Sequence, residues 1–385
     1  MVTVVAGTET SYSANVVVVR QLEDYIDNFS PKDFPLLKRV GLNSYPAAIT
    51  NTKLEWQRDE AIPLEDAVNG VAFDTTTETT LAVYHGAYFA LGDVILCESE
   101  LMQVTSVDVA NNTLTVIRGF AGSTAATHAV DNTAIYRLGT ARPEGSSPGW
   151  ARQTTTAQPF SYTQIFDDMV AITGTEEALK NYAPADLLSW RLDARMQEIY
   201  QLMEKALIYN SRRYAGTASL GRLSGGLDFW VADKNNLSNA ALAFDDIEDV
   251  MQEKFAAFGL SNVPDTIWVN GFVKRKISSW GMNTIRTDRT ENAVGNEITV
   301  LETNFGTVSV ELDHLITASH AWLLNMDKIQ IGPLQGRGFQ ELDASVPGDD
   351  QTKRRILGEY AFIVKGEDAS NAGLNCKIYG ISVTS

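Results

Sequence analysis

Cysteine and long apolar runs are scarce in this sequence of 385 residues. Its two cysteines, Cys97 and Cys376, cannot build a disulfide framework or a cysteine-rich metal cluster, and their scarcity favours a reducing compartment. The first residues, MVTVVAGTETSYS, have no basic region followed by an apolar core, so they predict no signal peptide. No stretch approaches the roughly 18 apolar residues that a membrane-spanning helix needs. We therefore expect no membrane partner.

Positive charge is also in short supply, since 31 Lys and Arg face 48 Asp and Glu, which gives a net charge of -17. A chain this acidic is repelled by DNA, RNA and anionic lipid unless its charges are strongly segregated. This balance disfavours a protein that reads nucleic acid. It is compatible with a container, because a negative wall keeps nucleic acid from adhering. The length of the chain predicts two or three domains.

Recognisable catalytic and ligand-binding motifs are absent as well. The histidines, none of which has metal-ligand spacing, are His85, His128, His314 and His320. The acidic pairs 167–168 and 176–177 are adjacent residues whose side chains diverge, whereas glycosidases need opposed carboxylates. The acids at 245–249 fit the first turn of a helix better than a cation site. The glycines match neither a P-loop nor a dinucleotide motif. We predict no catalytic residue, no cofactor, no metal and no enzyme activity.

The longest predicted element is a helix over 184–213. Apolar residues recur there at steps of three and four, namely Leu188, Leu192, Met196, Ile199, Met203 and Ala206. Pro184 suits the first helical position, and no Gly or Pro follows until Gly216. A helix of this length spans about 40 Å. We interpret it as a central element on which the strand-rich flanking sequence lies.

Short β runs separated by turn residues fill 78–140 and predict a small barrel or sandwich. An alternating strand at 52–59 precedes this stretch, and FSYTQIFDDMVAITGT follows it. We expect the two flanking strands to pair with each other. The small β domain would then be an insertion in a long hairpin.

The C-terminal half mixes helices and strands, so the predicted fold class is α+β. A helix is expected at Asp245–Phe258, with Asp245 and Glu248 as its capping box and Gly259 as its stop signal. DTIWVN predicts a buried strand, VKRKISSW a short helix, and RILGEYAFIV a strand covered on both faces. Two basic triplets, at 274–276 and 353–355, are either solvated surface or complementary to an acidic patch on a neighbouring copy of the chain.

Five stretches, in order and spacing, resemble the major capsid proteins of tailed double-stranded DNA bacteriophages. They are SPKDFPLLKRVG, YTQIFDDMVAITGTEEAL with the helix that follows, ETNFGTVSVELDHLI, WLLNMDKIQIGPL and RRILGEYAFIVKGEDASNAGL. The resemblance covers nearly the whole chain outside 78–140. That remaining stretch, with its RGFAGSTAATHA, is similar to small β domains grafted onto virion proteins.

The resemblance implies a Hong Kong 97-like capsid fold of the subgroup with a β domain inserted in the extended loop. Mapped onto this sequence, its parts are an N-terminal arm at 1–50, the extended loop at 51–77 and 141–172, the inserted small all-β domain at 78–140, a peripheral domain with the long spine helix at 173–240 and 331–385, and an axial domain at 241–330.

It also implies a major capsid protein that self-assembles into hexamers and pentamers, forming an icosahedral shell around phage double-stranded DNA without sequence-specific binding. Assembly would take place in the host cytoplasm, and the product would be part of the virion. The expected partners are other copies of the chain and a portal. Because no long helical scaffold-like segment precedes residue 50, we expect a separate scaffold or decoration protein.

The expected subunit-interface residues are Leu54, Trp56, Arg58, Tyr162, Ile165, Phe166, Lys274, Arg275 and Lys276. No residue set commits the chain to covalent cross-linking between subunits. Three alternatives stay open on the sequence alone. They are an encapsulin-type compartment that holds protein cargo, another virion structural protein such as a tail or decoration protein, and a carbohydrate-active enzyme.

Overall fold

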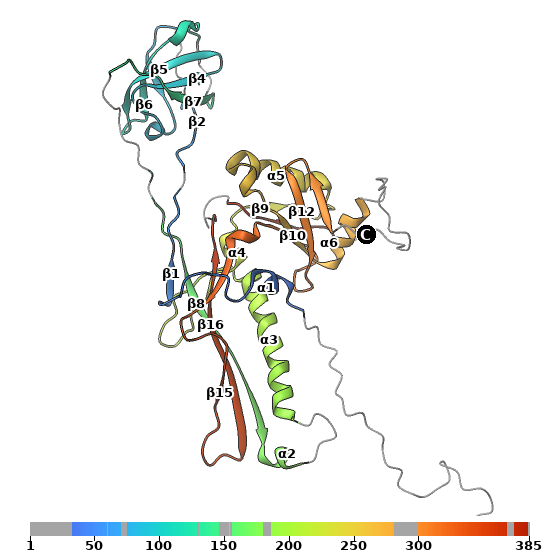
Figure 1. Cartoon of the computed structure of the whole chain (residues 1–385). Coiled ribbons are helices and arrows are strands. Elements are labelled where there is room, and N and C mark those ends of the chain that lie inside the picture. Colours follow the sequence, from blue (N-terminus) through green and yellow to red (C-terminus); the bar gives the residue numbers. More distant parts are fainter. Residues whose placement is uncertain are drawn as a thin grey trace, which may run out of the picture. The chain divides into compact units, whose positions relative to one another are not determined.

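The computed structural model describes residues 33–59, 61–70, 75–128, 131–145, 154, 156–179, 186–280, 299–367 and 373–383. The chain divides into two compact units, one formed by 56–159 and the other by 1–55 together with 160–385. Both contain β-sheet, and the second also carries the helices that Figure 1 labels. None of the helices in these described ranges is long and apolar enough to span a membrane.

The 56–159 unit is a small β-barrel. Its six strands are β2 (Glu65–Ala67), β3 (Thr80–Ala82), β4 (Asp93–Cys97), β5 (Glu100–Asp108), β6 (Thr113–Ile117) and β7 (Ala134–Thr140). They lie in the order β2-β7-β4-β5-β6-β3, and an antiparallel bridge between Val68 and Val83 joins the two ends of this order. The first strand lies outside the predicted range of 78–140, because Glu65-Asp66-Ala67 has no apolar alternation that would signal it.

The second unit contains a five-stranded sheet built on two long strands. They are β8 (Phe160–Thr173) and β16 (Gln351–Val364), which pair antiparallel along most of their length. The shorter strands are β1 (Lys53–Glu55), β14 (Ile329–Pro333) and β15 (Gln340–Asp343). The predicted pairing of the strands that flank the small β domain is confirmed, because β1 pairs antiparallel with β8, with Lys53 opposite Tyr162. The C-terminal half of β16 is buried on both faces, as its sequence predicts.

The long helix α3 (Leu187–Tyr209) packs along β8, as the light green helix of Figure 1 shows. It is shorter than predicted at both ends. Asp186 caps its first turn by accepting a hydrogen bond from the Ser189 amide, and Pro184 lies outside the described residues. The helix ends before Asn210, whose side-chain amide donates to Gln164 on β8. This tertiary contact ends the helix at a point where the sequence has no Gly or Pro as a stop signal.

A six-stranded sheet forms the rest of the second unit, in the order β11-β12-β10-β13-β17-β9. Its strands are β9 (Lys234–Asn236), β10 (Thr266–Val269), β11 (Val300–Thr303), β12 (Gly306–Leu312), β13 (Ala321–Leu324) and β17 (Cys376–Tyr379). The helices of the second unit besides α3 are α1 (Pro35–Val40), α2 (Gly174–Ala178), α4 (Leu227–Trp230), α5 (Phe244–Phe258) and α6 (Gly271–Trp280).

The predictions for this region hold with one exception. The expected buried strand is β10, all four residues of which are buried, and the expected helices are α5 and α6. The capping box of α5 was assigned to the wrong residues. The carboxylate of Asp246 accepts from the Ala243 amide, whereas Glu248 accepts from Asn304. Asp245 and Glu248 therefore do not form the cap.

A buried carboxyl group fastens α1 to α3. The Glu204 side chain on α3 is fully buried, and its Oε2 accepts a hydrogen bond of 2.9 Å from the Leu37 amide. Burial and the neighbouring carboxyl of Asp313 raise the pKa of Glu204 from 4.5 to about 8. Burial also raises the pKa of Asp313, which lies just after β12. The two carboxyl groups thus hold a proton at neutral pH at the point where three segments meet.

We predict that Glu204→Gln removes part of the pH dependence of subunit stability. In the unfolded chain Glu204 loses its proton near pH 4.5 and in the folded chain near 8, so its contribution to stability is complete below pH 4.5 and is lost as the pH rises towards 8. The variant should therefore stay close to the wild type at pH 5 and exceed its free energy of unfolding by about 4 kcal/mol at pH 8.

Thermal unfolding of the unassembled subunit, measured from about pH 5 to about pH 9, tests this effect. Asp193→Asn, at an exposed position of the same helix, is the control and should keep the wild-type pH profile. A Glu204→Gln profile that falls as steeply as the wild-type profile would contradict the prediction.

Candidate assembly surfaces

The two faces of the long strand β8 differ in how much of their surface is exposed. Phe166 and Val170 are both 7% exposed and lie on one face. Asp168, on the same face, pairs with Arg195 of α3 at 3.8 Å, which identifies this as the face that α3 covers. On the opposite face Ile165 is 44% exposed and Met169 is 52% exposed. Alternation along a strand therefore separates a covered face from an uncovered one.

The uncovered face continues across the neighbouring strands. Met169 lies opposite Arg355 of β16, and Arg355 lies opposite Leu342 of β15, which is itself 40% exposed. The charge on this face is partly neutralised, because Arg355 pairs with Asp167. We name the surface formed by Ile165, Met169 and Leu342 the outer sheet face. Exposed apolar side chains that adjoin one another commonly mark interaction surfaces.

The residues expected at subunit interfaces differ in the exposed fraction of their side chains. Leu54 and Tyr162 are half-buried on β1 and β8, and Trp56 and Arg58 are half-buried just beyond β1. Main-chain hydrogen bonds to the opposite strand continue past β1, since the Trp56 amide donates to the Pro159 carbonyl. These positions form a two-faced ribbon, as their alternating sequence predicts.

Phe166 differs from its neighbour Ile165. Its ring lies 6.1 Å from that of Phe362 and almost all of its surface is used within the subunit. Sequence alone cannot separate these two apolar neighbours, because each could occupy either face until the register with β16 is known. Exposed Ile165 remains a candidate interface residue, whereas Phe166 contributes to the subunit core.

The two basic triplets lie in different surroundings. Lys353, Arg354 and Arg355 all form ion pairs within the subunit, with Asp349, with Glu341 and Asp343, and with Asp167, respectively. The triplet Lys274, Arg275 and Lys276 lies on α6, where Arg275 and Lys276 are exposed. Arg275 and Lys276 are therefore the side chains of this triplet that α6 presents to solvent.

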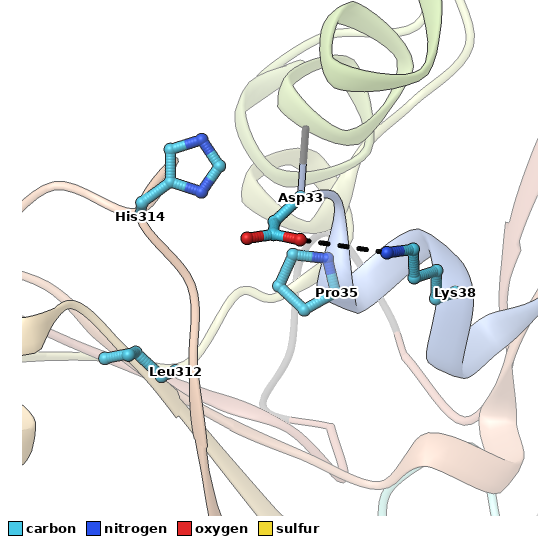
Figure 2. A pocket seen from close by; sticks show the side chains of 5 residues that line it. All are labelled: Asp33, Pro35, Lys38, Leu312 and His314. Atoms are coloured by element: carbon cyan, nitrogen blue, oxygen red, sulfur yellow. Dashed lines mark ion pairs between the residues drawn. The ribbon is translucent and has the colours of Figure 1, made fainter. Parts of the chain in front are cut away.

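A pocket of about 400 Å³ lies beside α1. Figure 2 shows its lining, to which Asp33, Pro35 and Lys38 come from α1 and the residues before it, and Leu312 and His314 from the end of β12 and beyond. Lys38 pairs with Asp33 across 3.9 Å. The described lining of the pocket offers one exposed ion pair and one imidazole, without a nucleophile that pairs with an oriented base.

Ion pairs engage the acidic pair at 167–168 and one of the other histidines. As expected, the adjacent acids diverge, with Asp167 paired to Arg355 and Asp168 to Arg195 on opposite faces of the sheet. His85 pairs with Asp66 on the barrel. Within the described ranges, no three His, Cys, Asp or Glu side chains are grouped so that they could hold a metal ion.

Sequence reasoning missed a buried charge network inside the barrel. Glu100 is fully buried, accepts two hydrogen bonds of 2.7 Å from Arg118, and contacts His128 at 3.0 Å. Burial raises the pKa of Glu100, but the hydrogen bonds from Arg118, Ala126 and Gly119 outweigh it and lower the pKa to about 2. The segment from Arg118 to His128 is therefore tied to a buried carboxylate, and these two residues were the available signal.

Comparisons with known proteins agree with this picture of a subunit with uncovered surfaces. The model of the family described as SU10 major capsid protein matches residues 4–375. No curated protein sequence matches the chain. Among solved structures, the Cyanophage A-1(L) capsid asymmetric unit is similar at 11% identity with a TM-score of 0.54, covering 97% of this chain and 99% of that one.

Two further structures are more distant. A structure from Mycobacterium phage Bobi has 11% identity and a TM-score of 0.49, with 96% of this chain and 98% of that one covered. An encapsulin complex from Synechococcus elongatus has 11% identity and a TM-score of 0.40, with 60% and 79% covered. The cyanophage similarity shows a capsid-like mixed α/β fold. Because the family model extends over almost the whole chain, this protein belongs to the SU10 major capsid protein family and is a structural component of a bacteriophage virion.

Proposed function

We propose that copies of this capsid protein assemble into hexamers and pentamers of an icosahedral shell that encloses phage double-stranded DNA. The observation that carries the proposal is the outer sheet face, which leaves Ile165, Met169 and Leu342 between 40% and 52% exposed beside a well-packed core. Obligate interfaces bury about 2,000 Å² or more and are rich in apolar surface. A sister subunit that covers this face would bury those side chains.

The parts of the subunit are assigned to the Hong Kong 97-like plan as follows. The α3 helix is the spine helix, β16 beside it belongs to the peripheral domain, and β8 belongs to the extended loop at 141–172. The axial domain at 241–330 contains α5, α6 and strands β10 to β13, and β9 and β17 from the peripheral ranges 173–240 and 331–385 complete its sheet. The extended loop carries the barrel, whose first strand begins at Glu65 and whose compact unit, 56–159, is wider than the 78–140 expected for the insertion. The N-terminal arm covers 1–50, of which 1–32 lie outside the described residues.

Charge supports enclosure of DNA without sequence-specific binding. The chain carries a net charge of -17, and an acidic inner wall does not retain a polyanion. We further propose that a portal and a separate scaffold or decoration protein take part in assembly, and that assembly occurs in the host cytoplasm. Co-purification from infected cells tests these partners, and shells that form complete and DNA-filled from this chain alone would count against them.

We predict that Trp56→Ala leaves the subunit folded but defective in assembly. The half-buried Trp56 side chain on the two-stranded ribbon can offer a large apolar contact to a neighbouring subunit. Loss of such a contact commonly weakens association by about 2 kcal/mol or more, roughly 30-fold. Circular dichroism of the subunit checks folding, and negative-stain electron microscopy checks shell formation.

The matched control for this variant is Gln57→Ala, which removes an exposed neighbour on the other face of the ribbon. It should form shells as the wild type does. Full-size shells in normal yield from purified Trp56→Ala would refute an interface role for this ribbon.

The α6 triplet, through its exposed Arg275 and Lys276, is proposed to steer subunits by meeting an acidic patch on a sister copy. We predict that Lys276→Glu slows assembly, measured by light scattering, at low ionic strength, and that the difference shrinks near 0.5 M salt, where charges are screened beyond about 4 Å. Lys276→Arg keeps the charge and should assemble normally. Equal assembly rates for wild type and Lys276→Glu at low salt would exclude this role.

A further inference from the structure

A buried lysine lies between α5 and the six-stranded sheet. The Lys254 side chain on α5 is fully buried, and its Nζ contacts Oδ2 of Asp233, the residue just before β9. Glu253 Oε1 lies 3.6 Å from the same nitrogen. Neither Lys254 Nζ nor Asp233 Oδ2 takes part in a hydrogen bond of ordinary geometry within the described residues. Burying a lysine ammonium without hydrogen bonds carries a high desolvation penalty.

A third ionisable group completes the cluster. Glu367, which follows β16, is 1% exposed, and its Oε1 accepts hydrogen bonds of 2.7 Å from both the main-chain and the side-chain nitrogen of Asn375. Burial raises the pKa of Glu367 to about 8, although the nearby positive charge of Lys254 lowers it. The Glu367 carboxyl group therefore exchanges a proton near neutral pH, within electrostatic reach of the amine.

The neighbouring thiol does not compete as a nucleophile. Cys376 on β17 lies against Asp233, but burial raises the pKa of its thiol far above neutrality. A protonated thiol is a poor nucleophile. The Lys254 amine is thus the group in this cluster that can attack the Asp233 carboxyl.

We propose that Lys254 and Asp233 join in an intramolecular isopeptide bond, with Glu367 as the proton carrier. Glu367 takes a proton from the Lys254 ammonium, which leaves a neutral amine in contact with the aspartate side chain. The Nζ–Cγ bond forms as the lone pair attacks Cγ. A second proton from nitrogen and the proton held by Glu367 then leave with one carboxyl oxygen as water. One ammonium and one carboxylate become an amide and a water molecule, and Glu367 returns to its starting state.

The position of the bond gives it a structural effect. Strand β9 has three residues, is the last in the sheet order, and pairs in parallel with β17. Such a short edge strand has few hydrogen bonds to hold it. A covalent link from Asp233 to α5 would close the chain between 233 and 254 and anchor this edge to the helix that covers the sheet. It would also replace two buried charges by a neutral amide.

Mass spectrometry of the purified full-length protein tests the proposal. Reaction lowers the mass by one water, about 18 Da, and a tryptic digest should contain a branched peptide linking Asp233 to Lys254. Lys254→Arg and Asp233→Ala, which remove the amine and the carboxyl group respectively, should each have the mass calculated from their sequences. Lys377→Arg is the matched control, because Lys377 is another partly buried lysine of this sheet that pairs with an aspartate, Asp228, at 2.8 Å. It should keep the loss of water.

Glu367→Gln tests the proton carrier separately, and it should yield mainly the unlinked form. An unlinked wild-type chain, with the full calculated mass and a linear peptide around Lys254, would overturn the proposal. Complete linkage in Glu367→Gln would overturn the role of Glu367 while leaving the bond itself in place. The wild-type measurement does not depend on any variant folding correctly.

Discussion

The antiparallel pairing of β8 with β16 is the constraint on which the rest of the second unit depends. It joins residues almost two hundred positions apart, as in the opposition of Thr173 and Gln351. Its register decides that Phe166 packs inward and that Ile165 and Met169 point outward. The helix α3 covers one face of this sheet, and we propose that a sister subunit covers the second. In this proposal, assembly into a capsid depends on the exposed apolar face of the sheet more than on any individual polar side chain.

Buried carboxyl groups fix how the segments around this sheet meet. Glu359 on β16 is 2% exposed and accepts from Thr163 of β8 and from Arg222, and it also pairs with Arg337 at 2.8 Å. Glu204 does the same for α1 and α3. Removing one partner from such a site leaves an unsatisfied buried group, which destabilises more than loss of a surface ion pair. These groups therefore favour one arrangement of distant segments over its alternatives.

Much of the fold could be predicted because local signals and tertiary structure agree. The helix α5 stops at Gly259 as its sequence indicates, and the uninterrupted apolar run in β16 corresponds to a strand covered on both faces. The pairing of β1 with β8 followed from alternation on both sides of the small β domain. The family resemblance predicted a phage capsid protein, and the match over 4–375 establishes the family.

What could not be predicted rests on contacts between segments far apart in sequence. The end of α3 is set by Asn210 reaching Gln164, and nothing within the helix signals it. In the sequence, Glu204 is an acid that shares a helix face with Tyr200 and Ile208, and nothing else marks it as buried. Glu100 is likewise one acid at the start of a strand. Which residues of β8 face inward depends on its register with β16, so the predicted interface residues include both Ile165 and Phe166.

The central claim is that the outer sheet face is exposed in the free subunit and covered in the assembled shell. Oxidation of methionine by dilute peroxide, followed by peptide mass spectrometry, measures this directly, because Met169 is 52% exposed on that face and Met102 is fully buried in the barrel. Met169 should oxidise rapidly in unassembled subunits and be strongly protected in shells, while Met102 stays protected in both. Equally rapid oxidation of Met169 in subunits and in intact shells would contradict the account.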